Sequence, residues 1–366
     1  MVKILILTTN RADYYKLEPI INIIHNNENI NMYLVVAGSH LLTDYGNTYL
    51  NIDYPIYKKV NTLINVEDNK FMSESVSFGL MKYTSILDDI NPDYVILHGD
   101  RFDILSMVNA CLLMNIDIIH IEGGEISGGV DNKIRNMTSI VAKYHIVSNI
   151  QAYNNLLKIV DNKNNIYNLG CPIIDKYNSI DYNNINLFED IIKELNLPII
   201  QNDYLIVSFH IDTIDYIKSK KDFINLFNII KKINKKTILF YPNIDNSDKE
   251  IIRYIDKNIT NNIIVFKNII FDKFTILLKN CSIFIGNSSA IVRESPYLGI
   301  QSILIGMRQK DRIISKNTYW LKNMDINVLE SKIFELYNKK YTPDYLYGDG
   351  LFYEKFKGFI NKLISN

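Results

Sequence analysis

The chain is poor in cysteine and carries no excess of charge of either sign. Its 366 residues include three cysteines, Cys111, Cys171 and Cys281, which lie far apart and form no C-x-x-C pair. A disulfide framework or a zinc knuckle is therefore not expected, and this cysteine usage favours a reducing compartment. The 40 basic and 40 acidic residues cancel, so neither a nucleic-acid-binding surface nor an acidic tail is indicated.

Targeting and membrane-spanning segments are also missing. The chain starts directly with an apolar strand pattern at residues 2–7 and becomes polar too soon for a signal peptide. No apolar run reaches the roughly 20 residues that a membrane-spanning helix needs. We therefore expect a cytoplasmic protein with no membrane and no nucleic-acid partner, and a length that suits two domains.

The short motifs of several common enzyme classes are absent. The turn after the first strand pattern lacks G-x-G-x-x-G, which excludes an ordinary dinucleotide fingerprint. No Walker loop supports ATP-dependent phosphoryl transfer, and no G-x-S-x-G elbow supports a hydrolase of that type. Neither H-E-x-x-H nor a histidine pair with zinc-ligand spacing occurs, so no metal site is expected.

Strand and helix patterns alternate through both halves of the chain. Apolar strand patterns occur at 2–7, 32–37, 94–97, 118–121, 144–148 and 166–169, and again at 204–209, 237–241, 262–266, 282–285 and 301–305. Helical patterns between them include 71–87 and 151–159. This alternation predicts an α/β fold with two doubly wound parallel sheets and a ligand cleft between the two domains.

A polar, irregular region at about 175–202 marks the expected domain junction. We place an N-terminal domain at 1–175 and a C-terminal domain at 176–350. A tail helix at 351–366 follows, and its apolar stripe suits packing across both domains or back onto the N-terminal domain.

The stretch from Gly99 to Arg135 gathers the strongest candidate chemistry. Two apolar strand patterns run into acidic residues there, Asp100 after the first and Glu122 after the second. Because open parallel sheets bind ligands at the carboxyl ends of their strands, both carboxylates are expected at one edge of the sheet. The chain then enters a helix in which Asp131 and Arg135 stand four residues apart and share one face.

Two interpretations of these carboxylates remain open. Asp and Glu often act simply as helix caps or solvated loop residues. However, Asp100, Glu122 and Asp131 follow successive strand patterns among several glycines, which let a backbone approach a ligand closely. Clustered carboxylates also raise one another's pKa, which suits proton transfer.

The second half offers a histidine and an anion-binding pattern. His210 follows the strand pattern that opens this half, so an acid/base role or a phosphate contact is a reasonable hypothesis. Gly286-Asn287-Ser288-Ser289 opens a helix whose N–H groups and hydroxyls would bind a phosphate. Glu294 suits ribose hydroxyls, and Arg308 suits a diphosphate. The alternatives are an ordinary Ser/Asn cap and a solvated basic loop.

The remaining histidines have weaker grounds for a role. His40 and His120 also stand at strand patterns, whereas His25, His98 and His145 are assigned to the scaffold.

Six groups of residues stand in order along the chain and span most of it. They are Arg11-Ala12-Asp13-Tyr14, Gly38-Ser39-His40, Gly99-Asp100-Arg101-Phe102-Asp103, His120-Ile121-Glu122-Gly123-Gly124-Glu125, Asp131 with Ile134-Arg135, and Gly286-Asn287-Ser288-Ser289 with Arg293-Glu294. Together with Gly306, Arg308 and Gln309, they resemble the hydrolysing UDP-N-acetylglucosamine 2-epimerases. The chain is especially similar to the epimerase part of the bifunctional epimerase/kinase of sialic acid synthesis.

This resemblance implies two Rossmann-like domains of the glycosyltransferase-B type. It also implies a reaction in which UDP is eliminated, a 2-acetamidoglucal forms, water adds at the anomeric carbon, and the neighbouring carbon is reprotonated on its other face. The products would be UDP and N-acetylmannosamine, a precursor of sialic-acid-type sugars. The resemblance implies no nicotinamide, no catalytic metal and no other cofactor, and an assembly into homodimers or homotetramers.

The resemblance also assigns residues to roles. Asp100, Glu122 and Asp131 correspond to the family's acid/base carboxylates, and Arg135 and His210 to its supporting active-site residues. The positions that correspond to UDP contacts are Arg11, Ser288, Ser289, Glu294 and Arg308. Those that correspond to positions near the sugar or the diphosphate are Asp13, His40 and Arg101.

One departure from the family pattern stands out. The family usually has His-Pro where this chain has His210-Ile211. Proline fixes its own backbone torsion, so its replacement leaves the placement of His210 open, and we expect activity to survive because the histidine is retained.

Four other functions remain open. The same machinery would serve a UDP-diacetamido-trideoxysugar of the bacillosamine type. A non-hydrolysing 2-epimerase, a glycosyltransferase of the same architecture and a catalytically silent UDP-sugar-binding protein are the others. The Glu122–Glu125 stretch and Met307-Arg308-Gln309 are more similar to the hydrolysing branch.

Overall fold

The chain folds into two compact units. The computed structural model describes the whole chain except residues 44–45, 65–69, 127–128, 183, 212–214, 243–248, 268 and 366. The first unit comprises residues 1–176 together with 347–366, and the second comprises residues 177–346. The boundary falls within a helix, α6 (Pro172–Asn178), near the start of the polar region in which the junction is expected. In the part of the chain that is described, no helix is long and apolar enough to cross a membrane.

The first unit is built on a seven-stranded parallel sheet with the order β3-β2-β1-β4-β5-β6-β7. Its strands are β1 (Val2–Thr8), β2 (Ile30–Ala37), β3 (Ile56–Val60), β4 (Tyr94–His98), β5 (Asp117–Ile121), β6 (Tyr144–Val147) and β7 (Ile166–Asn168). Its other helices are α1 (Arg11–His25), α2 (Phe71–Ile90), α3 (Leu105–Leu113), α4 (Gly129–Val141), α5 (Ile150–Leu156) and α13 (Phe352–Ser365).

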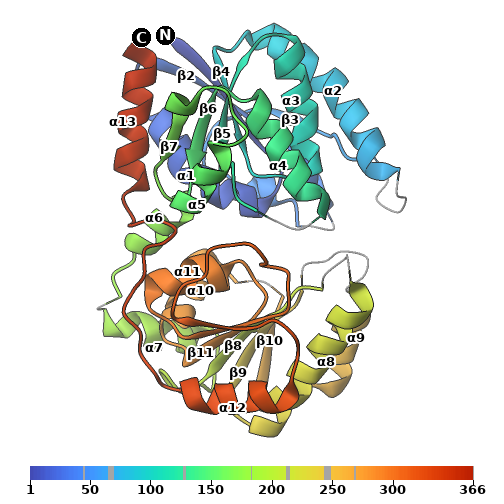
Figure 1. Cartoon of the computed structure of the whole chain (residues 1–366), viewed down its shortest axis with the longest axis vertical. Helices are drawn as coiled ribbons and strands as arrows, with labels where there is room; N and C mark the ends of the chain where they lie inside the picture. Colours follow the sequence, from blue (N-terminus) through green and yellow to red (C-terminus); the bar gives the residue numbers. More distant parts are fainter. Residues whose placement is uncertain are drawn as a thin grey trace. The chain divides into compact units, whose positions relative to one another are not determined.

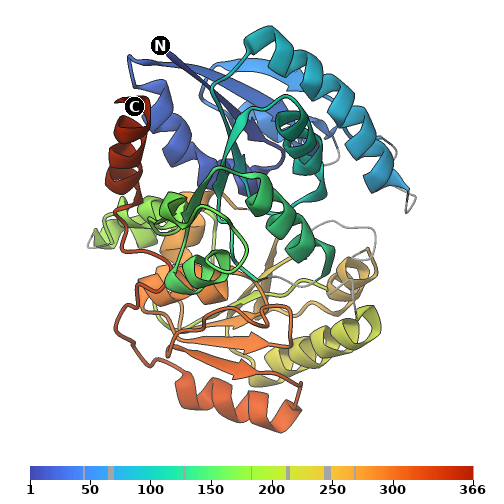
Figure 2. The same ribbon diagram turned by 45° about the horizontal axis from the view of Figure 1, so that its top comes forward.

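Helices cover both faces of this sheet. The apolar run of β1 is buried on both sides: Ile4 and Ile6 pack with α1 and α13, whereas Leu5 and Leu7 pack with α2 and α3. Continuous apolar runs of this kind are typical of strands covered on both faces. Figures 1 and 2 show α13 running beside α1, and the apolar stripe of α13 packs in their shared cluster.

The second unit repeats this plan with six parallel strands in the order β10-β9-β8-β11-β12-β13. The strands are β8 (Leu205–Ser208), β9 (Thr237–Phe240), β10 (Ile263–Phe266), β11 (Ile283–Gly286), β12 (Ser302–Ile305) and β13 (Thr318–Leu321). The helices are α7 (Ile185–Glu194), α8 (Tyr216–Ile233), α9 (Lys249–Asn258), α10 (Phe271–Lys279), α11 (Ala290–Leu298) and α12 (Ile326–Leu336). Both sheets have the doubly wound strand order, so the α/β fold class expected from the sequence is confirmed.

The bounds of several elements differ from those expected. The helix expected to end near Leu87 continues to Ile90, because Asn91 closes it in the left-handed conformation (φ 49°) with its N–H on the Leu87 carbonyl. The helix expected over 151–159 ends at Leu156. The edge strands β3 and β13 were not expected, because their short, half-exposed sequences lack the apolar run of the central strands.

Candidate active site

Each sheet has one point at which the order of its strands reverses. In the first unit the chain leaves β1 for β2 on one side, and β4 later adds to the other side. In the second unit β8 stands between β9 and β11 in the same way. Ligands of open α/β sheets bind beyond the carboxyl ends of the strands at such a point. At the first reversal point, Asp13 follows β1 and His98 is the last residue of β4. At the second, His210 follows β8 and Asn287 follows β11.

In the first unit a buried histidine joins two buried acidic residues. Nδ1 of His98 contacts Oδ1 of Asp13, and its Nε2 lies 3.2 Å from Oε2 of Glu122. The register of the sheet accounts for the second contact, because His98 is paired with Ile121, the residue before Glu122. Asp13 belongs to the first turn of α1, which begins after its N-cap Asn10.

The Glu122 carboxylate has two further donors. Lys16 Nζ lies 2.6 Å from Oε2, and the Cys171 thiol donates to Oε1 at 2.8 Å. Glu122 also has a φ of 62°, and every other described non-glycine residue with positive φ is Asn or Asp. A larger side chain in this conformation costs free energy and is held there by its surroundings, as is common at functional sites.

The ionisation of His98 reflects opposing effects. Burial alone would lower the pKa of this imidazole, but the charge of Asp13 and the hydrogen bonds with Asp13 and Glu122 outweigh burial and raise it. The sequence analysis assigns His98 to the scaffold, and the structure instead brings it into contact with two predicted site residues, Asp13 and Glu122. Its position directly before Gly99-Asp100, at the end of a central strand, is the signal that could have identified it.

Asp100 lies in a second charged group at the same edge of the sheet. Its carboxylate forms an ion pair with the guanidinium of Arg135, which is buried. Nη1 of Arg135 also donates to the carbonyl of Glu125 at 2.7 Å, so the guanidinium joins the loops after β4 and β5. Asp131 stands one turn before Arg135 and is exposed in the first turn of α4.

A buried, neutral histidine, His120, holds the backbone at Gly99, directly before Asp100. Nε2 of His120 lies 2.9 Å from the Gly99 carbonyl, and Nδ1 lies 3.0 Å from the Ser139 hydroxyl. Burial lowers the pKa of His120 to about 3, so the ring is neutral at physiological pH. Because a carbonyl only accepts, Nε2 carries the hydrogen and Nδ1 accepts from Ser139.

The other predicted residues of the first unit have different surroundings. His40 is buried between the hydroxyls of Thr8 and Thr48, at 3.0 and 2.8 Å, and burial lowers its pKa to about 4 despite the nearby charge of Asp13. Arg11 is half-buried at the first position of α1. Arg101 is exposed, with its Nε 3.5 Å from Oδ2 of the buried Asp103.

In the second unit an asparagine side chain fixes the backbone at His210. The N–H of His210 donates to Oδ1 of Asn287 at 2.7 Å, and Nδ2 of Asn287 donates to the His210 carbonyl at 2.7 Å. Burial and the positive charge of Arg308 lower the pKa of His210 to about 3, so its ring is neutral at physiological pH. These two bonds fix the backbone of His210 directly before Ile211.

The carbonyl of Asn287 binds the loop after β12. Nε2 of Gln309 donates to it at 2.9 Å, and Nη1 of Arg308 lies 3.4 Å from it. Ser288 and Ser289 precede α11 and are half-buried, and Ser289 is its N-cap. Glu294, within α11, is buried. The structure therefore places His210 at the side chain of Asn287, and Arg308 and Gln309 at its carbonyl.

A glycine is required where β8 and β11 lie side by side. Gly286 has a φ of 143°, and a Cβ atom on it would lie 1.9 Å from the carbonyl oxygen of Ser208. Any side chain would push the two strands apart at the reversal point and displace Asn287 from His210.

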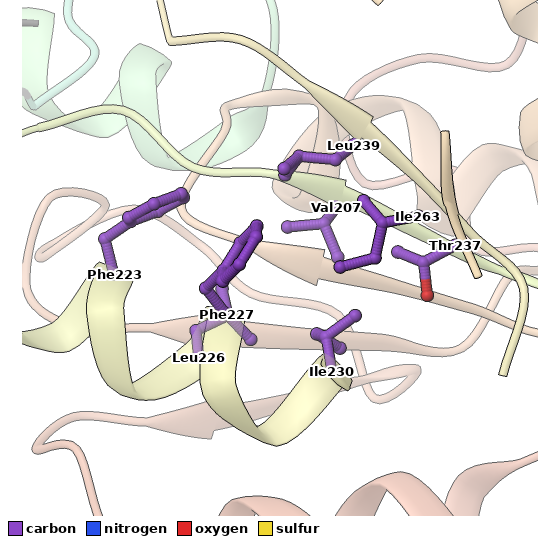
Figure 3. A pocket seen from close by; sticks show the side chains of 8 residues that line it. All are labelled: Val207, Phe223, Leu226, Phe227, Ile230, Thr237, Leu239 and Ile263. Atoms are coloured by element: carbon purple, nitrogen blue, oxygen red, sulfur yellow. The ribbon is translucent and has the colours of Figure 1, made fainter. Parts of the chain in front are cut away.

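A small cavity in the second unit is separate from these residues. It has a volume of about 10 Å³ and lies between α8 and strands β8–β10 (Figure 3). Its lining is apolar apart from Thr237, whose hydroxyl donates to the Lys235 carbonyl, so the cavity lacks the several polar partners that a water molecule or a substrate would need. We interpret it as a packing gap in the core. Among the described residues, no three His, Cys, Asp or Glu side chains are arranged to hold a metal ion.

Two doubly wound units with polar residues at both reversal points define an α/β protein of the glycosyltransferase-B type. The crystal structure of UDP-GlcNAc 2-epimerase from Neisseria meningitidis bound to UDP-GlcNAc has this fold, with a TM-score of 0.83, 17% identity and 100% coverage of both chains.

Sequence comparison identifies the family. Residues 22–361 match the family model described as UDP-N-acetylglucosamine 2-epimerase. The chain is 31% identical over 317 residues to UDP-N-acetylglucosamine 2-epimerase of Neisseria meningitidis serogroup B. The aligned region covers 87% of this chain and 83% of the relative. It is 28% identical over 350 residues to GDP/UDP-N,N'-diacetylbacillosamine 2-epimerase (hydrolyzing) of Campylobacter jejuni, and this alignment covers 93% of this chain and 89% of that relative. The chain belongs to the UDP-N-acetylglucosamine 2-epimerase family.

Proposed function

We propose that the chain is a hydrolysing UDP-N-acetylglucosamine 2-epimerase that converts UDP-N-acetylglucosamine and water to UDP and N-acetylmannosamine. The observation that carries this proposal is that two carboxylates, Asp100 and Glu122, follow neighbouring strands and have different hydrogen-bond and ion-pair partners. Glu122 is buried with Lys16 and His98, and Asp100 is paired with Arg135. An elimination followed by reprotonation on the opposite face needs more than one acid/base group, and different surroundings let two carboxylates differ in proton affinity.

The proposed reaction is an elimination followed by a hydration. A carboxylate removes the proton from the sugar carbon next to the anomeric carbon, and the electrons of that C–H bond form a double bond to the anomeric carbon. The anomeric C–O bond breaks at the same time, and UDP leaves with its electron pair. The double bond then takes a proton from a carboxylic acid at the neighbouring carbon, on its other face, and water adds at the anomeric carbon and gives its surplus proton to a carboxylate. Asp100, Glu122 and Asp131 are the groups proposed for these transfers.

The second unit is proposed to bind the UDP that leaves. Negative charge grows on the diphosphate as the bond breaks, and cations and helix N-termini stabilise such charge. Ser288 and Ser289 at the start of α11 and Arg308 after β12 suit the phosphates, and Glu294 suits the ribose hydroxyls. The neutral His210 suits hydrogen bonding without adding charge. From the first unit, Arg11, Asp13, His40 and Arg101 are proposed to contact the sugar or the diphosphate.

Two features support the hydrolysing reaction over the non-hydrolysing one. The residues that are most similar to the hydrolysing branch contact the proposed site: the Glu125 carbonyl binds Arg135, and Gln309 binds Asn287. In addition, relatives from Campylobacter jejuni and Legionella pneumophila, at 28% and 27% identity, are named as hydrolyzing enzymes. Both act on N,N'-diacetylbacillosamine nucleotides by name, so that sugar is the second candidate substrate.

Proton NMR of the purified protein in deuterated water tests the proposal. With UDP-N-acetylglucosamine we expect free UDP and N-acetylmannosamine with deuterium next to its anomeric carbon. UDP-N-acetylmannosamine as the product would assign the non-hydrolysing reaction instead. A reaction with UDP-N,N'-diacetylbacillosamine alone would assign the second substrate. Turnover only after an acceptor sugar is added would indicate a glycosyltransferase.

The variants Asp100→Asn and Glu122→Gln test the assignment of the carboxylates. Each removes a titratable group while keeping the shape of the side chain. UDP release should fall by at least about 100-fold in each variant, the scale typical of general acid–base catalysis. Full activity in either variant, with the fold intact by circular dichroism, would contradict its role.

We also propose that the chain forms a homodimer or homotetramer through the first unit. The helices α2, α3 and α4 pack in sequence over one face of its sheet (Figure 1). They expose large apolar side chains: Met72, Phe78 and Met81 on α2, Leu112 and Leu113 on α3, and Val130, Met137 and Ile140 on α4. Large apolar side chains exposed on neighbouring helices often mark protein interfaces.

A further inference from the structure

His98 contacts two acidic residues, and the hydrogen-bonding capacity of its ring limits its charge state. Nδ1 contacts Asp13, and Nε2 lies 3.2 Å from Oε2 of Glu122. An ionised carboxylate only accepts hydrogen bonds, whereas a neutral imidazole has one donor nitrogen and one acceptor nitrogen. A neutral His98 would therefore turn a lone pair toward one of the two carboxylates, unless that carboxylate itself carried the proton.

Both carboxylates also accept hydrogen bonds from other donors. Oδ2 of Asp13 accepts from the backbone N–H of Thr9 at 3.2 Å and from its hydroxyl at 3.1 Å. Oε2 of Glu122 accepts from the Lys16 ammonium at 2.6 Å. Hydrogen bonds to the charged form of a carboxylate favour that form. The proton shared among the three side chains is therefore held by His98.

Charge balance leads to the same conclusion. With a protonated His98, the group contains two cations, His98 and Lys16, and two anions, Asp13 and Glu122, all with side chains at most 20% exposed. Buried charges persist in proteins when they are paired and hydrogen-bonded. The titratable groups around His98 are Asp13 and Lys16 from α1, Glu122 and His120 from the end of β5, and, in contact with Glu122, Cys171 before α6.

We propose that His98 is a buried imidazolium and a positioning residue for Glu122. It keeps the Glu122 carboxylate ionised and fixes its Oε2 oxygen in place. The other oxygen, Oε1, is then the one that accepts and returns the substrate proton. Oε1 accepts from the Cys171 thiol, which is a weaker donor than the Lys16 ammonium or the His98 imidazolium on Oε2. Exchanging that thiol contact for a proton therefore costs less than displacing Lys16 or His98. The proposal rests on the proposed function, because it takes Glu122 as an acid/base group of the epimerase.

Nitrogen NMR of histidine-labelled protein tests the charge of His98 without any reference to activity. The ring signals of His98 and His120 are assigned from the variants His98→Gln and His120→Gln. At pH 7 to 8 we expect both ring nitrogens of His98 to carry a proton. His120, which has a carbonyl and a hydroxyl as partners, serves as the internal control with one protonated nitrogen. An unprotonated nitrogen on His98 at pH 7 would overturn the proposal.

The variant Asp13→Asn provides a second measurement if His98→Gln fails to fold. It replaces one anion by a neutral amide and keeps the ring in place. The imidazolium should then lose its proton at a pH at least about one unit lower than in the wild type, because an adjacent carboxylate shifts a pKa by one to three units. An unchanged titration would show that Asp13 does not hold the charge on His98.

The pH dependence of UDP release tests the effect on Glu122. Loss of the imidazolium in His98→Gln should reduce kcat by about 10-fold or more and move the acid limb of the kcat profile to higher pH by about one unit. Cys171→Ala is the matched control, since it removes a neutral donor from the same carboxylate and should move the acid limb less. A lower kcat with an unmoved acid limb would indicate a merely structural role for His98.

The failure of this inference differs from the failure of the proposed function. If the wild-type protein releases no UDP from either nucleotide sugar, the proposed function fails and the nitrogen spectra still report the charge of His98. If the wild type is active and His98 is neutral, only the inference fails.

Discussion

Asn287 holds the backbone of His210 by both its N–H and its carbonyl. The two bonds, each of 2.7 Å, join the loop after β11 to the loop after β8, the two strands at the reversal point of the second sheet. A proline at position 211 would fix only its own torsion, whereas the asparagine fixes the residue that carries the imidazole. The chain thus retains a defined His210 turn with isoleucine at position 211.

Replacing this asparagine should damage both stability and catalysis. In Asn287→Ala, the buried N–H and carbonyl of His210 lose their partners, which costs about 2–4 kcal/mol of unfolding free energy. UDP release should fall by at least about 10-fold, because the backbone of His210 loses the side chain that holds it, and the Asn287 carbonyl that binds Arg308 is no longer tied to that turn. Urea unfolding followed by the fluorescence of Trp320, the single tryptophan, measures the first effect within the second unit.

The control for this variant is Asn317→Ala. Asn317 is a buried asparagine of the same unit whose side chain donates to the Ile300 carbonyl. Its replacement should lower stability by a similar amount and leave kcat unchanged. Equal losses of activity in both variants would show that Asn287 acts through general stability alone.

Histidines that are buried without a charge should make the protein sensitive to acid. Burial lowers the pKa of His120 and His210 to about 3. It lowers the pKa of His40 and His145 to about 4. In the unfolded chain these rings take up protons below about pH 6.5, and in the folded chain they do not. Stability present above pH 6.5 should therefore fall as the pH drops toward 4.

His120→Gln isolates one of these contributions. Each such histidine adds up to about 1.4 kcal/mol to the loss of stability per pH unit. The buried carboxyl groups of Asp103 and Asp175, whose pKa burial raises, act in the opposite direction and cancel in the difference between variant and wild type. Urea unfolding between pH 7 and 5 should show a shallower pH dependence in the variant, and an identical slope would contradict the prediction.

Asp175 caps a helix that begins 177 residues later. Its carboxylate accepts from the N–H of Phe352 at 2.9 Å and from the N–H of Tyr353, the first two residues of α13. Asp175→Ala should cost about 1–2 kcal/mol, as expected for the loss of an N-terminal cap. Hydrogen exchange of the α13 amides, read by mass spectrometry, should be faster in the variant.

Asp349→Ala is the matched control for the cap. Asp349 precedes the same helix, and its half-exposed carboxylate binds Lys355 and the N–H of Leu351. An exposed ion pair contributes little stability, so exchange in α13 should change less than in Asp175→Ala. The reverse order would show that the local Asp349 turn, rather than Asp175, fixes the start of α13.

The apolar side chains on α3 and α4 should control the oligomeric state. Leu113 and Ile140 are exposed there at 79% and 63%. The double variant Leu113→Glu with Ile140→Glu should convert the proposed homo-oligomer to monomers, because buried carboxylates oppose association. Light scattering after size-exclusion chromatography gives the mass. Ile217→Glu, on the exposed surface of α8, should leave the oligomer intact, and a monomeric wild type would refute the proposal.

Many of the residues of the candidate site could be predicted from the sequence, because parallel strands place their ends at one edge of a sheet. Asp100 and Glu122 were expected near each other on these grounds, and the structure places them after β4 and β5. His98 could not be assigned in this way. The strand before it is apolar, and only the sheet register with Ile121 and the position of α1 bring its ring between Asp13 and Glu122.

The amino-acid sequence is sufficient to predict the two doubly wound sheets, because alternating apolar strands and amphipathic helices bury their apolar faces only in such layers. It also specifies which polar side chains follow the strands. The tertiary structure alone decided which of them touch: Arg135 with Asp100, Lys16 and Cys171 with Glu122, and Asn287 with His210. These contacts join residues up to 106 positions apart, and their geometry depends on strand order and register, which local sequence patterns do not encode.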